Sequence, residues 1–303
     1  MPVIPPYLVA GDTIGLICPS GYMPAEKVET CYQTLQAWGF KVKLGTTIGH
    51  QFHYFSGTDE RRMNDLQDML DDVEVKAVLC ARGGYGLARI IDKVHFKQFK
   101  KKPKWVIGYS DITLLLSHIY TLYGICTIHA PMAAAFNDGE YNNEYVLSLK
   151  NALLGFKTDF VCGIHYLNKI GLSEGKLVGG NLALLAHATG TASQLKTKRR
   201  ILFIEDVGEY TYTVDRMMQQ LKRSGQLDHL AGLIVGGFTD MKDTTLPFGK
   251  NVYEAIHDVV KEYDYPVCFG FPVGHQKENF ALKVGGGYQL GVKEKMVTLK
   301  ELG

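Results

Sequence analysis

The segment Trp105-Val106-Ile107-Gly108-Tyr109-Ser110-Asp111 predicts a buried strand over residues 105–107 and a turn, and residues 112–123 predict the helix that follows. The same alternation recurs along the first half of the chain. Further strands are predicted at residues 13–18, 40–44, 75–80 and 125–128, and further helices at residues 25–38, 59–70 and 87–94. Strands that alternate with helices are typical of a mostly parallel sheet with helices on both faces.

The alternation weakens after residue 137. Residues 138–168 are polar and contain no strong strand, which predicts a linker. Glycine-rich turns dominate the remainder, and a closing hairpin is predicted from residues 288–292 and 296–299. We therefore predict an α/β protein: an N-terminal domain over residues 1–137 with a mostly parallel sheet flanked by helices, a linker over 138–168, and a β-rich C-terminal domain over 169–303.

Composition restricts the possible partners and the compartment. The 303 residues are 46% hydrophobic and 21% charged, and the net charge of +2 gives no reason to expect nucleic acid or an anionic membrane as a partner. The basic cluster at residues 97–104 is expected to be an exposed loop. Residues 112–137 lack charged side chains, but they contain Gly124 and Pro131 and are interpreted as a helix and a strand, not a membrane span. Six cysteines without a C-x-x-C pair, and no signal peptide, predict a soluble cytoplasmic protein.

Three chemically active side chains follow predicted strands. Ser110 follows residues 105–107, Glu205 ends the apolar run 201–204, and His275 follows a run that begins at Cys268. Active groups of α/β enzymes gather at the carboxyl ends of strands, and serine, histidine and an acid are the groups of a catalytic triad. From residue physics alone, however, the favoured interpretation of Ser110 or Asp111 is a helix cap.

Residue physics does not decide which acid and which histidine would complete such a triad. Asp206 and Glu209 compete with Glu205 for the role of the acid, and His129 also follows an apolar run, so it cannot be separated from His275. His118 is excluded because it lies about 12 Å of helical rise from Ser110. Ser173 lies in a formal G-x-S-x-G pattern but lacks the preceding strand and the following helix that a nucleophile needs.

The turn Arg82-Gly83-Gly84-Tyr85-Gly86 follows a predicted strand, and its backbone N–H groups could approach a phosphate or an oxyanion. Its spacing differs from the nucleotide-binding motifs, so it could equally be a simple tight turn. No metal site and no cofactor are expected, because there is no H-E-x-x-H motif and no paired cysteine, and the pair His50 and His53 lacks a carboxylate at ligand spacing.

Five segments together resemble the LD-carboxypeptidase family of serine peptidases, which includes muramoyltetrapeptide carboxypeptidases and microcin C immunity peptidases. These segments are Ala81-Arg82-Gly83-Gly84-Tyr85-Gly86, Gly108-Tyr109-Ser110-Asp111, Gly179-Gly180-Asn181-Leu182, Ile204-Glu205-Asp206-Val207-Gly208-Glu209 and Gly270-Phe271-Pro272-Val273-Gly274-His275. Their order and spacing extend the resemblance from Asp12 to Gly287. It implies an N-terminal α/β domain linked to a β-rich C-terminal domain, in agreement with the division above.

The resemblance also implies a mechanism. Ser110 would be the nucleophile, His275 the base and Glu205 the orienting acid, with an oxyanion hole made by the backbone N–H groups of Asp111 and Gly84. The substrate would be a murein tetrapeptide that loses its terminal D-alanine during cell-wall recycling. Candidate substrate-binding residues are Arg82, His129 and Arg216, because a guanidinium can bind a carboxylate. A homodimer is also expected.

The chain departs from the family pattern at Lys283, near which many members have a proline, and this difference could alter the wall of the pocket. Two further functions stay open. One is a peptidase that detoxifies a peptide–nucleotide antibiotic, as the immunity relatives do. The second is a binding module for a small anionic ligand, without catalysis.

Overall fold

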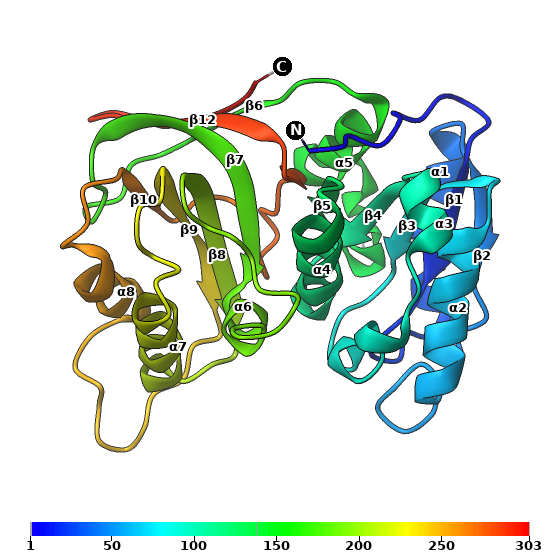
Figure 1. Ribbon diagram of the computed structural model, residues 1–303, viewed down its shortest axis with the longest axis horizontal. Helices are drawn as coiled ribbons and strands as arrows, with labels where there is room; N and C mark the ends of the chain where they lie inside the picture. The colour runs from blue at the N-terminus through cyan, green and yellow to red at the C-terminus, as the bar shows by residue number, and fades with distance from the viewer. Residues whose placement is uncertain (1, 138, 303) are drawn as a thin grey trace. The chain divides into compact units, whose positions relative to one another are not determined.

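The computed structural model describes residues 2–137 and 139–302 and divides into two compact units. Unit 1 comprises Met1–Phe156 and Phe280–Lys283, and unit 2 comprises Lys157–Asn279 and Val284–Gly303. Each unit has its own sheet and its own helices (Figure 1). The α/β class predicted from the sequence is confirmed.

The segment predicted as a linker contains regular structure. Helix α5 (Glu144–Leu154) belongs to unit 1, strand β6 (Asp159–Cys162) belongs to unit 2, and the chain passes between the units after Phe156. The helix forms because Asn143 caps it and because Val146, Leu149 and Leu153 are fully buried. The first residue of the predicted linker, 138, lies outside the described residues, as do the chain ends 1 and 303.

Unit 1 is built on a six-stranded sheet. Its strands are β1 (Thr13–Ile17), β2 (Lys41–Leu44), β3 (Val75–Cys80), β4 (Trp105–Gly108), β5 (Thr127–His129) and β11 (Leu282–Val284). The strand order is β11-β5-β4-β3-β1-β2, and neighbouring strands from β5 to β2 in this order pair in parallel. The order 2-1-3-4-5 is that of a doubly wound sheet, in which the direction of winding reverses between β1 and β3.

Helices and short 3₁₀ turns connect these strands. The helices are α1 (Glu29–Ala37), α2 (Asp59–Asp71), α3 (Lys97–Lys101), α4 (Thr113–Tyr123) and α5, and the 3₁₀ turns are η1 (Ala25–Lys27), η2 (Leu87–Arg89), η3 (Ile91–Lys93), η4 (Ser110–Ile112), η5 (Ala133–Phe136) and η6 (Glu140–Asn142). Helix α4 followed by β5 confirms the interpretation of residues 112–137 as a helix and a strand. Among the described helices, none has the length and apolar character that a membrane crossing needs.

Two local predictions for unit 1 are wrong. Residues 87–94 form η2 and η3 and not one helix, because Ile90 between them leaves the helical region at φ −123°. The basic cluster at residues 97–104 is not an exposed loop: it begins with α3, and Lys104 is only 5% exposed.

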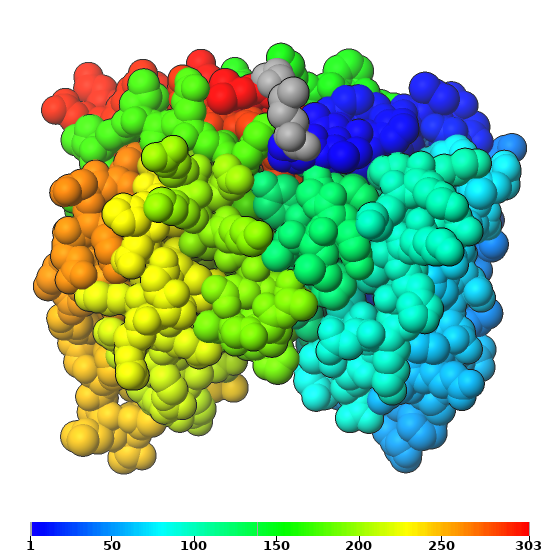
Figure 2. Space-filling view, in the orientation of Figure 1, coloured from blue at the N-terminus to red at the C-terminus, as the bar shows by residue number. Residues whose placement is uncertain are grey.

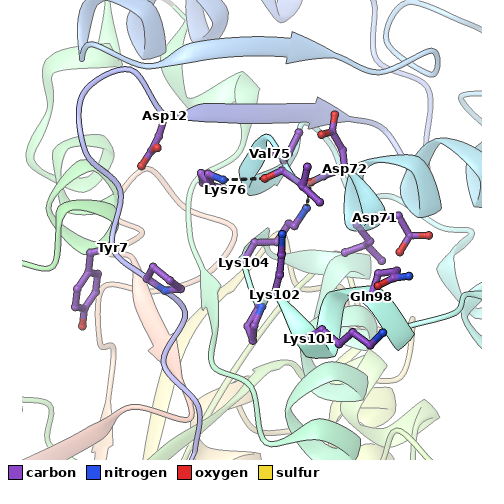
Figure 3. A pocket seen from close by; sticks show the side chains of 14 residues that line it. Tyr7, Asp12, Asp71, Asp72, Val75, Lys76, Gln98, Lys101, Lys102 and Lys104 are labelled. Carbon is purple, nitrogen blue, oxygen red and sulfur yellow. Dashed lines mark hydrogen bonds between the residues drawn. The ribbon is translucent and has the colours of Figure 1, made fainter.

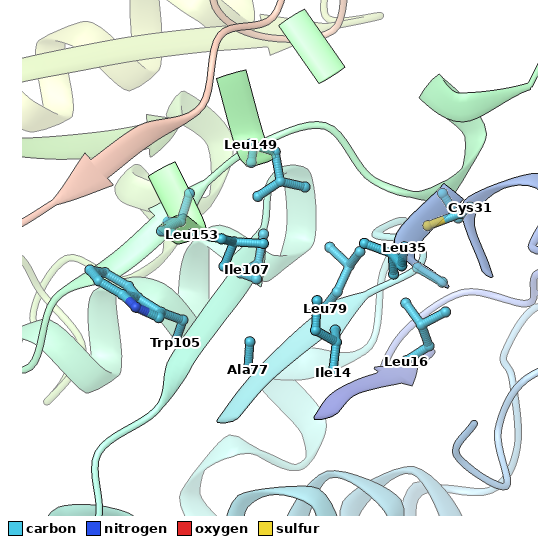
Figure 4. Close-up of a cluster of buried hydrophobic side chains, with 14 of the residues drawn as sticks. Ile14, Leu16, Cys31, Leu35, Ala77, Leu79, Trp105, Ile107, Leu149 and Leu153 are labelled. Carbon is cyan, nitrogen blue, oxygen red and sulfur yellow. The ribbon is translucent and has the colours of Figure 1, made fainter. Parts of the chain in front are cut away.

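One hydrophobic cluster of unit 1 lies on one face of its sheet. Alternate residues of the central strands, among them Ile14, Leu79 and Ile107, are fully buried and belong to one cluster with Leu35 of α1 and Leu149 of α5 (Figure 4). Burial of each such side chain contributes about 1.5–3 kcal/mol. The carboxyl ends of the strands are therefore held firmly in relation to one another.

Unit 2 has a seven-stranded mixed sheet. Besides β6, its strands are β7 (Gly171–Asn181), β8 (Arg200–Val207), β9 (Gly232–Thr239), β10 (Val267–Phe269), β12 (Gly287–Val292) and β13 (Val297–Glu301), in the order β10-β9-β8-β7-β12-β13-β6. Strands β7 to β10 are parallel, and β12, β13 and β6 continue the sheet in antiparallel pairs. The hairpin predicted at the end of the chain is confirmed as β12 and β13.

Three helices accompany the parallel half of this sheet: α6 (Leu182–His187), α7 (Thr211–Arg223) and α8 (Val252–Val260). A capping box formed by Asn251 and Glu254 fixes the start of α8. The loop before α8 is exposed throughout residues 242–251 and is visible in gold at the lower edge of Figure 2.

Candidate functional site

The loops that follow β1 and β3 meet at the point where the sheet of unit 1 reverses its winding. The backbone N–H of Gly21, after β1, donates to the carbonyl of Gly83, after β3, at 2.9 Å. Ligands of doubly wound sheets bind at the carboxyl ends of the strands on either side of this point. The glycine-rich turn at residues 82–86 is therefore placed where a ligand is expected.

Ser110 lies in a sharp turn between β4 and α4. Its φ of +63° is in the left-handed region, which a non-glycine residue adopts only where the surrounding structure holds it. A strained serine between a strand and a helix is the backbone geometry of a nucleophile elbow, although the G-x-S-x-G pattern is absent here. The geometry therefore presents the hydroxyl at the end of the strand.

Gly83 lies directly against Ser110. A Cβ atom added to Gly83 would be 2.7 Å from Cβ of Ser110, 3.0 Å from its Oγ and 3.2 Å from the backbone nitrogen of Asp111. No side chain fits in this space, so glycine is required. The absence of a side chain lets the backbone of the turn reach the serine.

Two backbone N–H groups flank this contact. One belongs to Asp111, and the other belongs to Gly84, whose φ of +95° favours glycine. Because the carbonyl of Gly83 points at Gly21 and the peptide is trans, the N–H of Gly84 points away from Gly21. Both groups are fixed by the fold before any substrate binds, which is what an oxyanion hole requires.

The helix cap favoured from residue physics alone is not observed. The N-cap positions of η4 and α4 are Tyr109 and Ile112, and neither makes a side-chain capping bond. The carboxylate of Asp111 is buried and instead accepts hydrogen bonds from Ser20 Oγ at 2.6 Å and from the N–H of Leu87 at 2.9 Å. Asp111 thus connects the loops after β1, β3 and β4.

In unit 2, neighbouring acids at the end of β8 face different partners. Glu205 is fully buried and contacts His275, whereas Asp206 accepts hydrogen bonds from Asn181 Nδ2 and from the N–H of Ala183, each at 2.9 Å. Successive side chains of a strand point to opposite faces, so only one of the two acids can approach the histidine. The structure places Glu205, not Asp206, in that position.

His275 lies in the loop that follows β10, and its Nδ1 is 2.6 Å from Oε2 of Glu205. Gly274 makes this approach possible: its φ is +123°, and an added Cβ would be 2.7 Å from Cβ of Glu205. The carbonyl of His275 accepts from Thr239 Oγ1 at 2.8 Å, which fixes the loop. The histidine side chain is 17% exposed while that of Glu205 is fully buried, so the imidazole is the accessible end of the pair.

Burial and charge act in opposite directions on His275. Burial lowers the pKa of the imidazole, but the hydrogen bond to Glu205 and the negative charges of Glu205 and Asp206 outweigh it, so the pKa is raised above its ordinary value. Burial is also the main reason why the pKa of Asp206 is raised to about 6. A carboxylate that binds Nδ1 orients the ring and stabilises its protonated form.

The other predicted residues lie in varied surroundings. His129 is fully buried at the end of β5, beside Gly108, and packs on the ring of Tyr109 at 5.5 Å. Arg82 is exposed and donates to the carbonyl of Tyr22 at 2.5 Å. Arg216 lies on α7 with its guanidinium 5.2 Å from the centre of the Tyr212 ring.

Ser173, in the formal G-x-S-x-G pattern, lies within β7 and not at a turn into a helix. Conversely, sequence reasoning missed Tyr54, whose hydroxyl oxygen would lie 2.9 Å from a Cβ on Gly84. The aromatic stretch at residues 52–55 was the available signal. Across residues 2–137 and 139–302, no cluster of three or more histidine, cysteine or acidic side chains is arranged to hold a metal ion.

A strained serine at the end of a parallel strand and a buried glutamate–histidine pair define the class: a two-domain α/β protein with the groups of a serine hydrolase. Family comparison agrees. Residues 14–130 match the LD-carboxypeptidase N-terminal domain, and residues 174–290 match the LD-carboxypeptidase C-terminal domain. The chain belongs to the LD-carboxypeptidase family.

Relatives and solved structures agree with this membership. A probable murein peptide carboxypeptidase of Bacillus subtilis is 34% identical over 98% of this chain and 94% of its own length, and a murein tetrapeptide carboxypeptidase of Pseudomonas aeruginosa is 30% identical over 90% and 91%. The crystal structure of muramoyltetrapeptide carboxypeptidase from Oxalobacter formigenes has a TM-score of 0.87 at 28% identity and covers 95% of this chain and 98% of its own. The microcin C7 self-immunity protein MccF has the same TM-score at 23% identity, with 99% of each chain covered, and shares the fold.

Proposed function

We propose that this protein is an LD-carboxypeptidase that removes the terminal D-alanine from murein tetrapeptides, with Ser110, His275 and Glu205 as its catalytic triad. The observation that carries the proposal is the Glu205–His275 pair, because a buried carboxylate at 2.6 Å from Nδ1 leaves Nε2 as the nitrogen that can accept a proton. The names of the Bacillus and Pseudomonas relatives support the choice of substrate.

In the proposed reaction, Ser110 Oγ attacks the carbonyl of the L-to-D peptide bond and His275 accepts the hydroxyl proton. The negative charge on the carbonyl oxygen is stabilised by the N–H groups of Asp111 and Gly84, each of which contributes about 3 kcal/mol, as single donors do in other hydrolases. The protonated His275 then donates to the leaving D-alanine amine. Water, activated by the same histidine, hydrolyses the acyl-enzyme and restores Ser110.

A carboxypeptidase also has to recognise the free carboxylate of its substrate. We propose Arg82 for this role, since it adjoins the glycine turn, is exposed and has guanidinium N–H groups besides the one that donates to Tyr22. The buried His129 supports Tyr109 beside the nucleophile in this scheme, and Arg216 is a second candidate for a substrate carboxylate.

The direct test is D-alanine release from a purified murein tetrapeptide, followed by mass spectrometry. Wild-type protein should release D-alanine and leave the tripeptide. A substrate with L-alanine in the last position should be resistant, because the specificity is for the L-to-D bond. No release of D-alanine from any tetrapeptide by folded wild-type protein would contradict the proposal.

An aromatic surface in unit 1 favours a second candidate substrate. Phe52, Tyr54 and Tyr85 are 44%, 53% and 51% exposed, and Tyr54 lies beside Gly84. Such rings can stack on a planar nucleotide base, and MccF has been solved with aspartyl sulfamoyl adenosine. If this compound is the better substrate, the protein should release aspartate from it with a higher kcat/KM than it releases D-alanine.

A binding module without catalysis is the third candidate. Labelling with a fluorophosphonate distinguishes it, because only a serine activated by a base reacts. We expect one label at Ser110 in the wild type and no label in His275→Ala. Binding of the tetrapeptide without labelling and without turnover would favour the module.

A further inference from the structure

A cavity of about 950 Å³ opens in unit 1 at the amino ends of β1, β3 and β4. It lies between the N-terminal segment, with Tyr7, the end of α2 and the segment from Gln98 to Lys104 (Figure 3). Ser110 follows the carboxyl end of β4, whereas this cavity adjoins its amino end at Trp105. The cavity is thus separate from the proposed active site.

Some of the charged side chains that line the cavity have an ion-pair partner, and others have none among the described residues. Three acids line the cavity: Asp72 forms an ion pair with Lys43 at 2.7 Å, whereas Asp12 accepts from the N–H of Val9 at 2.8 Å and Asp71 accepts from Gln67 Nε2 at 2.9 Å. By contrast, Lys101 and Lys102 are exposed and, among residues 2–137 and 139–302, have no ion-pair partner. The lining thus holds four lysines and three acids, and one of these acids is paired with Lys43 from outside the lining, so the cavity has an excess of positive charge.

Lys104 is the buried cation of the cavity wall. It is 5% exposed, and its Nζ donates to the carbonyls of Met69 at 3.0 Å and Asp72 at 2.5 Å, at the end of α2. Burial lowers the pKa of this ammonium to about 8, with the charges of Asp72 and Asp71 acting to raise it and those of Lys76 and Lys43 to lower it. A nearby anion would favour its charged form.

The rest of the lining is mostly apolar and includes Pro6, Leu70, Val75 and Pro103 together with the ring of Tyr7. A cavity with an apolar wall and a few polar groups at one place is typical of a small-molecule site. We propose that this cavity is a second ligand site, which binds a small amphipathic carboxylate with its apolar body against Tyr7 and Val75 and its acidic group at Lys101 and Lys102.

Occupancy of this site can be read from Trp105. The ring of Tyr7 stacks on Trp105 at 5.8 Å, and the indole N–H of Trp105 donates to the carbonyl of Pro6 at 3.0 Å. A ligand that contacts Tyr7 and Pro6 thus changes the surroundings of this indole. Trp38, the other tryptophan, is removed in a Trp38→Phe background so that emission reports on Trp105 alone.

The test compares three probes with one apolar body and different charge: 4-phenylbutanoate, 4-phenylbutanamide and 4-phenylbutylamine. In the Trp38→Phe protein, Trp105 emission should saturate with the carboxylate at a Kd about tenfold lower than with the amide, and the amine should bind more weakly still. Equal or tighter binding of the amine would overturn the proposal, and so would no binding of the carboxylate.

Variants locate the bound probe. Lys101→Gln with Lys102→Gln should raise the Kd of the carboxylate about tenfold and leave that of the amide unchanged. The matched control is Lys293→Gln with Lys295→Gln, which removes the same charge from an exposed turn of unit 2 and should change neither Kd. Arg82→Gln should also leave the Kd unchanged. A loss of binding in Arg82→Gln, or an equal loss in the control pair, would contradict the site.

Discussion

The two halves of the proposed catalytic machinery are constructed differently. In unit 1, the proposed groups are positioned by backbone conformation. Ser110 has a positive φ, and because Gly83 has no side chain, its backbone can lie against Ser110. In unit 2, they are positioned by contacts between side chains: Glu205 is buried, and its Oε2 lies 2.6 Å from Nδ1 of His275. Unit 1 thus positions backbone N–H groups and a hydroxyl, whereas unit 2 orients an imidazole and stabilises its protonated form.

This difference has a consequence for substitution. The arrangement in unit 1 depends on glycine at particular positions and should tolerate changes of charge nearby. The Glu205–His275 pair in unit 2 depends on charge, so its function should respond to pH. Variants in the two units should therefore fail in distinguishable ways, by loss of geometry in unit 1 and by loss of electrostatics in unit 2.

The largest effect is expected for Ser110→Ala. Removal of the nucleophile should lower kcat for D-alanine release by at least about 10⁴-fold, because no covalent intermediate can form. Steady-state kinetics on a murein tetrapeptide measures it, and circular dichroism should show an unchanged fold. Ser173→Ala is the matched control, since it removes the serine of the G-x-S-x-G pattern within β7 and should retain full activity. Loss of activity in the control alone would reassign the nucleophile.

The next effect is expected for Glu205→Gln, which keeps the shape of the side chain and removes its charge. We expect kcat to fall about 10³-fold, since the histidine loses the partner that stabilises its protonated form. Glu209→Gln, four residues later, should be close to wild type. Equal losses in the two variants would show that the orienting acid is not Glu205.

The pH profile of the same pair gives an independent readout. His275 must be neutral to accept a proton, so kcat/KM falls as the pH drops through its pKa. Because Glu205 raises that pKa, the acid limb of wild type should lie above pH 6.5. In Glu205→Gln the hydrogen bond and the charge of Glu205 are lost, burial still lowers the pKa of His275, and only the weaker effect of Asp206 still raises it, so the residual activity should extend to lower pH. An unmoved limb would mean that another group titrates.

A smaller effect is expected for Gly83→Ala in unit 1. The new methyl group would lie 2.7 Å from Cβ of Ser110, so the serine must move, and kcat should fall about 100-fold with KM little changed. Gly163→Ala is the control, because a Cβ there meets no atom within 4 Å. In contrast with the unit 2 variants, the pH profile of Gly83→Ala should keep its acid limb. A shifted limb would contradict the division of labour between the units.

The sequence predicts features that depend on neighbouring residues better than features that depend on contacts between residues far apart in the chain. The strand–turn–helix at residues 105–123 and the closing hairpin follow from local periodicity, and the structure confirms both. The positive φ of Ser110 was not predictable from local periodicity, and neither was its close approach to Gly83, which is far away in the chain. The same is true of His275: only the folded unit brings Glu205 to its Nδ1, and residue patterns alone left it equal to His129.

Local sequence patterns gave wrong predictions for polar segments that are buried in the fold. Residues 138–168 are polar enough to predict a linker, yet α5 buries one apolar face and packs as part of unit 1. Lys104 closes a run of lysines that predicts solvent exposure, but the carbonyls at the end of α2 accept its hydrogen bonds and hold it inside. In both cases the partners are distant in sequence, and periodicity within a short window does not report them.

The smallest effect concerns Asp206, which lies next to Glu205 and accepts a hydrogen bond from the N–H of Ala183 in the first turn of α6. Burial raises its pKa to about 6, so between about pH 4 and pH 6 the folded protein binds more protons than the unfolded chain. This contribution to the free energy of unfolding is therefore present at low pH and lost as the pH rises through 6. Asp206→Asn cannot titrate, so from pH 4.5 to pH 7 its stability relative to wild type should improve by about 2 kcal/mol, as measured by urea unfolding.

Asp258 provides a control of opposite sign in the same unit. Hydrogen bonds from Lys250 and Lys261 lower its pKa to about 2, so its contribution is present at neutral pH and is lost only as the pH falls. The stability of Asp258→Asn relative to wild type should not improve from pH 4.5 to pH 7. If Asp206→Asn behaves in the same way as this surface variant, the buried acid at the end of β8 is not protonated near pH 6. The charge of Asp206 would then act on His275 at every pH in the range, and the acid limb of kcat/KM would reflect both carboxylates and not Glu205 alone.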